Sequence, residues 1–118
     1  MVLAAGIIDV DGLGARMHLE LNYRYSHKTK MTMYVFTVFK RNPYGSERVY
    51  QLAVTQSAKP MKDVHRKSHE HYGDARIMGQ ASWERWDFDA VLAHFCAQTG
   101  IVFDPQPPHP EHFELTGR

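Results

Sequence analysis

The stretch RMHLELNYRY, residues 16–25, alternates between polar and apolar side chains without interruption. Successive side chains of a β-strand point to opposite faces, so a period of two is typical of a strand with one face buried. The apolar positions are Met17, Leu19, Leu21, Tyr23 and Tyr25. We therefore predict a half-buried strand here, with His18 and its polar neighbours facing solvent.

More strands are predicted on both sides of this stretch. A short strand is expected at residues 6–10. Residues 31–40 are rich in β-branched and aromatic residues on both faces, which predicts a central strand covered on both sides. A turn containing Pro43 and Gly45 leads to a strand at 48–55, whose apolar face is Tyr50, Leu52 and Val54. Short links between successive strands indicate an antiparallel meander.

A helix is predicted after the sheet. Asp87 suits an N-cap position, because its side chain can accept a hydrogen bond from a free backbone N–H. Residues at helical spacing then form one apolar face, and Gly100 ends the helix. This face consists of Phe88, Val91, Leu92, Phe95 and Thr99. Residues 81–86 are expected to form a short strand or the approach to the helix, and residues 101–103 a last strand.

These elements predict a single α+β domain over residues 1–104. It consists of an antiparallel sheet of four to five strands in a meander, with one main helix packed on one face. Residues 105–118, which hold four of the six prolines, are expected to form an extended tail. The expected core consists of Met17, Leu19, Leu21, Val35, Leu52, Val54, Val91, Leu92 and Phe95.

Composition limits the classes of function. At 118 residues with 43% hydrophobic and 23% charged residues, the chain is typical of one soluble globular domain. A net charge of +1 argues against nucleic-acid binding through overall charge, so any such contact needs a local basic patch. The single cysteine, Cys96, excludes an intrachain disulfide and fits a reducing compartment. With no candidate membrane span, we expect a cytoplasmic protein without membrane association.

A histidine-rich segment interrupts the pattern at about residues 57–80. His65, His69 and His71 fall within seven residues there, and no apolar period runs through them. The segment is therefore predicted to be a long loop, and loops of this length inside compact domains are commonly functional.

The histidines are compatible with three kinds of function. The first is a metal-dependent hydrolase: the His-x-His spacing of His69 and His71 would place both rings on one face of a strand, and His65 could complete the set. Against a metal site, Arg66 and Lys67 would repel a dication, and no carboxylate is identifiable to support the ligands. We therefore expect no metal and no cofactor.

The second function is metal-free RNA cleavage. Histidines near their ordinary pKa can act as both general acid and general base. Arg48, Arg66 and Lys67 would contact phosphate, and Tyr72 would stack on a base or donate a hydrogen bond. The third is a non-enzymatic binding or inhibitor protein from a mobile element, with the histidine-rich loop as its interface.

A family resemblance favours the second function. The strand containing Arg48-Val49-Tyr50 is followed by His69-Glu70-His71-Tyr72-Gly73 and then by the helix from Asp87 to Phe95. This order resembles the small TumE-type toxins of bacterial toxin–antitoxin modules, over about residues 17–103. The resemblance implies an RNA-directed toxin that is neutralised by a cognate antitoxin. We therefore expect a toxin-like RNA-cleaving protein with His65, His69 and His71 as its catalytic residues.

Overall fold

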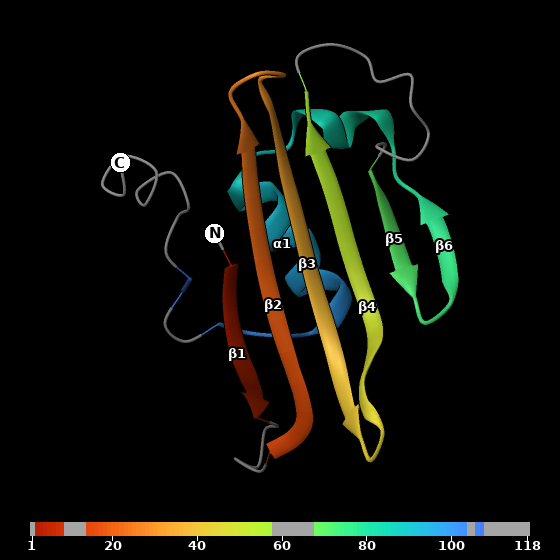
Figure 1. Ribbon diagram of the computed structural model, residues 1–118. Helices are drawn as coiled ribbons and strands as arrows, with labels where there is room; N and C mark the ends of the chain where they lie inside the picture. Colours follow the sequence, from red (N-terminus) through yellow and green to blue (C-terminus); the bar gives the residue numbers. More distant parts are fainter. Residues whose placement is uncertain (1, 9–13, 58–67, 104–105, 108–118) are drawn as a thin grey trace.

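A single antiparallel sheet forms the centre of the molecule in a computed structural model, which describes residues 2–8, 14–57, 68–103 and 106–107. The sheet has six strands in the order β1-β2-β3-β4-β5-β6, so each strand pairs with its neighbour in sequence (Figure 1). The strands are β1 (Val2–Ile8), β2 (Gly14–Ser26), β3 (Met31–Asn42), β4 (Gly45–Gln56), β5 (His69–Tyr72) and β6 (Ala75–Met78). The α+β fold class and the meander are confirmed.

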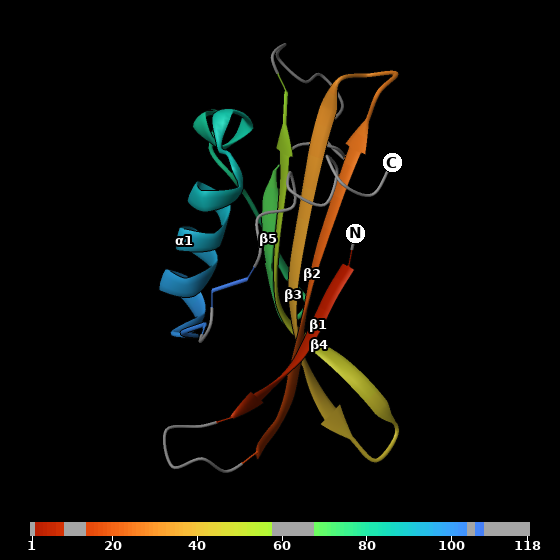
Figure 2. The same ribbon diagram turned by 90° about the vertical axis from the view of Figure 1, so that its left-hand side faces the viewer.

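One helix, α1 (Phe88–Thr99), covers one face of the sheet after a short 3₁₀ helix, η1 (Ala81–Arg85). Figure 2 shows α1 and η1 on the same side of the sheet, and no described helix or strand lies over the opposite face. We call the two sides the helix face and the open face. Among the described elements, none provides the second cover that was predicted for β3.

The core lies between α1 and the middle strands. Leu52, Val54, Val91 and Phe95 are completely buried, and Phe36 is 1% exposed. Edge-to-face packing joins the rings of Phe36 and Phe95, with centroids 5.6 Å apart. Aromatic pairs of this geometry contribute beyond the area that they bury. The helix is therefore held mainly by β3 and β4.

Seven of the nine predicted core residues are buried, and the other two differ for separate reasons. Met17 is half-buried and packs against the edge of the core. Val35 lies on the open face, because Tyr34 and Phe36 on either side of it point toward the helix. In a strand with apolar residues on both faces, the sequence alone does not show which face meets the helix.

The ends of α1 are as predicted. The Asp87 side chain accepts a hydrogen bond from the backbone N–H of Ala90 at 2.9 Å. Gly100 is in the left-handed conformation, with a φ of 73°, and its N–H bonds to the carbonyl of Cys96. Glycine adopts this conformation without the strain that a Cβ atom causes.

Several sequence predictions need correction. Residues 69–78 are a β-hairpin and not part of a loop over 57–80. Residues 81–85 are a 3₁₀ helix, and residues 101–103 form no strand. The first strand spans residues 2–8, where 6–10 was predicted. Nearly all of the expected tail, 105–118, lies outside the described residues. Neither helix in the described part of the chain has the length and apolar character needed to span a bilayer.

Candidate functional site

The short strand β5 divides the histidine-rich motif between the two faces of the sheet. Because side chains alternate along a strand, His69 and His71 lie on the open face, and Glu70 and Tyr72 lie on the helix face. The His-x-His spacing places both histidines on one face because this segment is a strand, where a loop was predicted. Their rings are perpendicular, with centroids 4.9 Å apart.

Polar and basic residues from three strands surround the two histidines. His71 pairs with Gln51 on β4 and with Arg76 on β6. Gln51 donates a hydrogen bond to the Thr37 hydroxyl at 2.9 Å and lies 3.4 Å from a guanidinium nitrogen of Arg48. We call His69, His71, Arg48, Gln51 and Arg76 the open-face cluster.

The electrostatic environment of the open-face cluster favours a neutral His71. Desolvation by burial lowers the pKa of His71, and electrostatic interaction with Arg48, His69 and Arg76 lowers this pKa further. Its Nδ1 atom is shielded from solvent and has no hydrogen-bond partner among the described residues. An uncharged imidazole can accept a proton as a general base, and the two guanidinium groups beside it could bind an anion.

The helix face of β5 holds a second polar cluster. The buried Glu70 carboxylate accepts a hydrogen bond from the Tyr50 hydroxyl at 2.6 Å. The same carboxylate oxygen lies 3.1 Å from Nε2 of His94 and 3.2 Å from the Tyr72 hydroxyl, which also lies 2.9 Å from Gln98. These contacts join β4, β5 and α1. We call Glu70, Tyr50, Tyr72 and His94 the helix-face cluster.

Both tyrosines of the helix-face cluster are held in their protonated form. Burial raises the pKa of Tyr50, and its hydrogen bond to Glu70 and the nearby carboxylate charge raise that pKa further. The pKa of Tyr72 is raised by burial and then by the charge of Glu70. The ring of His94 lies 5.0 Å from that of Trp83 and 5.1 Å from that of Trp86. The helix-face cluster is therefore filled by its own side chains, as expected for a structural network.

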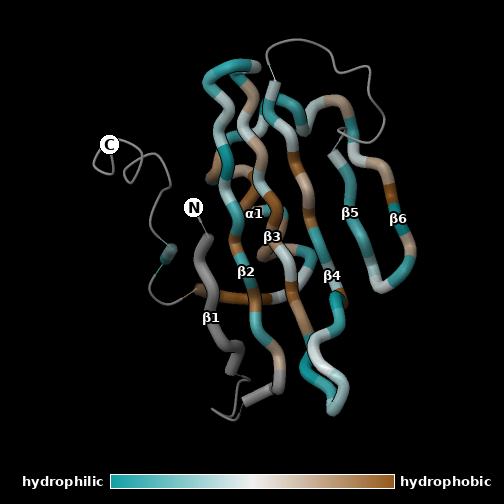
Figure 3. Tube along the Cα trace, in the orientation of Figure 1, coloured by the Kyte–Doolittle hydropathy of each residue, from teal (hydrophilic) through white to brown (hydrophobic). Residues whose placement is uncertain are grey.

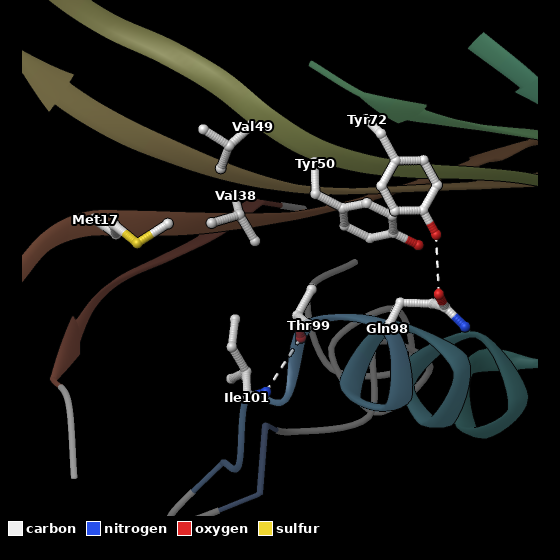
Figure 4. A pocket seen from close by; sticks show the side chains of 8 residues that line it. All are labelled: Met17, Val38, Val49, Tyr50, Tyr72, Gln98, Thr99 and Ile101. Carbon is white, nitrogen blue, oxygen red and sulfur yellow. Dashed lines mark hydrogen bonds between the residues drawn. The ribbon is translucent and has the colours of Figure 1, made fainter. Parts of the chain in front are cut away.

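A cavity of about 280 Å³ lies beside this cluster, at the C-terminal end of α1 (Figure 4). Its walls are mostly apolar, with the Tyr72–Gln98 hydrogen bond at one side. The lining residues are Met17, Val38, Val49, Tyr50, Tyr72, Gln98, Thr99 and Ile101. The cavity has no titratable pair suited to acid–base catalysis, so the open face is the better candidate site.

The structure brings together only some of the residues that the sequence suggested. Arg48, His69 and His71 belong to the open-face cluster. Tyr72 lies on the helix face and so cannot stack on a base bound at the two histidines. The other three suggested residues, His65, Arg66 and Lys67, lie outside the described residues.

Sequence reasoning missed Gln51 and Arg76, which reach the histidines through strand pairing. The signal that could have identified them is the alternation of His69-Glu70-His71-Tyr72, read as a strand that pairs with β4. Within the described residues, no group of three or more histidine, cysteine, aspartate or glutamate side chains is arranged to hold a metal ion.

Comparisons of the chain with protein-family models, with curated proteins and with solved structures found no match. Function is therefore inferred from the residues of the open-face cluster.

Proposed function

We propose that the protein cleaves RNA by metal-independent general acid–base chemistry on the open face of its sheet. The observation that carries this proposal is the pair His69 and His71, with rings 4.9 Å apart and with Arg48 and Arg76 close enough to lower the pKa of His71. Two imidazoles and two guanidinium groups supply a base, an acid and the positive charge that phosphoryl transfer requires.

The mechanism assigns a different role to each histidine. Neutral His71 takes the proton from a ribose 2′-hydroxyl, and the 2′-oxygen then attacks the adjacent phosphorus. Protonated His69 donates its proton to the 5′-oxygen as the P–O5′ bond breaks. The products are a 2′,3′-cyclic phosphate and a 5′-hydroxyl, and the next cycle begins once each histidine has exchanged its proton with water. Arg48 and Arg76 stabilise the charge on the phosphoryl oxygens.

The biological setting belongs to the same proposal. The resemblance to TumE-type toxins supports a cytoplasmic toxin whose activity a cognate antitoxin blocks. The open face is a suitable target for such an antitoxin, since a protein bound there would exclude RNA from both histidines. His65, Arg66 and Lys67 are proposed to act with the open-face cluster, as a further histidine and two phosphate contacts.

The direct test is cleavage of a single-stranded RNA by purified protein and by its His71→Ala variant. Loss of one proton-transfer group should lower turnover by about 10²–10⁴-fold. A substrate with a deoxyribose at the scissile position should not be cut. Equal cleavage of DNA, or full activity of the His71→Ala variant, would contradict the mechanism.

A binding protein without catalytic activity is the second candidate. It is favoured by β6, which lies at the edge of the sheet formed by the described strands and in which Ile77 is 49% exposed and Met78 is 45% exposed. An unpaired strand edge with exposed apolar side chains can accept a strand from a partner. A toxin should inhibit growth when it is expressed without an antitoxin, whereas a binding protein should express freely and co-purify with its partner.

A further inference from the structure

A second feature of the open face lies beside the open-face cluster. His18 on β2 and Phe39 on β3 are cross-strand partners, and their rings are nearly parallel, with centroids 5.0 Å apart and an interplanar angle of 16°. Both side chains are only half-buried, so part of this stacked pair faces solvent. The proposed catalytic steps use neither residue.

Two cross-strand neighbours flank the stacked pair. On one side, Phe39 pairs with Arg48 on β4. On the other side, His18 pairs with Gly6 on β1. The two rings thus lie in one row of the open face with a basic residue, and part of their surface is accessible to a ligand.

The stacked pair is also connected to the histidines proposed for catalysis. Arg48 lies 3.4 Å from the side chain of Gln51, which pairs with His71. Residues that pair across neighbouring strands form rows on each face of the sheet, and positions two residues apart on a strand are about 7 Å apart. The stacked pair therefore lies in the row next to that of Gln51 and His71. A molecule lying across the open face could therefore contact both rows at once.

We propose that His18 and Phe39 form a stacking site for an unpaired RNA base and hold the strand whose phosphate reaches Arg48, Gln51 and His71. This proposal rests on the proposed function, since it names how the RNA substrate is held. Bases stack on protein aromatic rings when they are splayed out of a helix, which single-stranded RNA permits and a duplex does not.

Charge complementarity on the open face supports a nucleic acid as the occupant. The described side chains on this face include Arg24, Arg48 and Arg76, against the single carboxylate of Glu20. Local positive charge of this kind can bind a phosphate backbone although the chain as a whole carries only +1. A stacking site accepts any base, so binding should depend little on sequence.

The test measures binding of a short single-stranded 2′-O-methyl RNA, which cannot be cleaved through its blocked 2′-oxygen. Replacing Phe39 with Leu keeps an apolar side chain but removes the ring, so binding should weaken by about 5- to 150-fold. The matched variant Phe39→Trp keeps an aromatic surface and should bind at least as tightly as the parent protein. Thermal melting of both variants checks that the sheet is intact.

One further variant separates stacking from charge. Arg48→Gln should reduce the slope of log K against log salt by about 0.7, the value for one phosphate contact on a single strand, whereas Phe39→Leu should leave the slope unchanged. A salt slope that falls in Phe39→Leu as much as in Arg48→Gln would overturn the stacking assignment.

The outcomes distinguish this inference from the proposed function. If the parent protein binds and cleaves RNA but Phe39→Leu binds equally well, the stacking site is wrong and the catalytic proposal stands. Loss of binding in both Phe39→Leu and Phe39→Trp would also overturn it, because an aromatic ring would then be insufficient. If the parent protein neither binds nor cleaves single-stranded RNA, both proposals are wrong.

Discussion

The two faces of β5 carry residues of the same polar kind in very different surroundings. On the helix face, Glu70 is 8% exposed, and its hydrogen-bonding neighbours come from β4, β5 and α1. On the open face, His69 and His71 are half-buried, and no described helix or strand lies over them. Residues one position apart therefore have separate surroundings: one face of β5 is packed beneath α1, and the other carries the site that we propose for chemistry.

This separation means that changes on one face should leave the other largely unaffected. Substitutions on the helix face should alter the free energy of unfolding, with little effect on the proposed RNA cleavage by the protein that stays folded. Substitutions in the open-face cluster should change the proposed RNA cleavage and leave the free energy of unfolding nearly unchanged. The following predictions test that comparison.

The largest effect on stability is expected from Leu92→Ala in α1. Leu92 is 8% exposed and belongs to the core, so its truncation should cost about 2–5 kcal/mol of unfolding free energy. Denaturant unfolding measures this loss. The matched variant Ala97→Ser, at an exposed position of the same helix, should stay within about 0.5 kcal/mol of the parent protein. Equal stability of the two variants would contradict the packing described for α1.

A smaller loss of unfolding free energy is expected from Glu70→Leu. The change leaves the buried Tyr50 hydroxyl without its acceptor and should cost about 1–3 kcal/mol. Glu70→Gln keeps an acceptor oxygen at nearly the same place and should lose less. If the two variants are equally stable, the hydrogen bonds of the helix-face cluster contribute little to folding.

Removing the N-cap of α1 should lower the unfolding free energy by a still smaller amount. Asp87→Ala removes the acceptor for the Ala90 N–H and should cost about 1 kcal/mol. Thermal melting at fixed protein concentration should show the decrease, and Asp87→Asn should retain most of the stability. The proposed RNA cleavage by the folded fraction should be unchanged, since Asp87 does not belong to the open-face cluster.

The smallest expected effect is the pH dependence of stability that arises from His71. Because the folded protein lowers the pKa of His71 below its ordinary value of 6.5, the unfolded chain binds a proton more readily at this residue. The His71 contribution to stability is therefore unchanged above that ordinary value and is lost as the pH falls from 6.5 through the folded pKa. NMR titration of the imidazole should give a midpoint below 6.5, and Arg48→Gln should raise it. A midpoint at or above 6.5 would contradict the environment described for His71.

The sequence was informative wherever burial imposed a period. Two patterns predicted the observed elements: the alternation of residues 16–25 and the helical spacing of Phe88, Val91, Leu92 and Phe95. Both patterns arise because each of these elements turns only one face toward the core. The α+β class and the ends of α1 followed from the same reasoning.

The hairpin of β5 and β6 could not be predicted in this way. Both strands have only four residues, and β5 is hydrophilic along its length (Figure 3). The buried residue of β5 is Glu70, which is satisfied by hydrogen bonds and so leaves no apolar signal. The candidate site was therefore only partly predicted: His69 and His71 were identified by type and spacing, whereas Gln51 and Arg76 depend on register.

The chain order of the elements has a consequence for synthesis on the ribosome. β2, β3 and β4 present their shared apolar face before α1 exists, because α1 begins at Phe88 and β4 ends at Gln56. At a translation rate of about 5–20 residues per second, the helix follows β4 after a delay on the order of seconds. During that interval the nascent sheet exposes Phe36, Leu52 and Val54 to other chains. We therefore expect newly made protein to bind general chaperones until α1 emerges and covers this face.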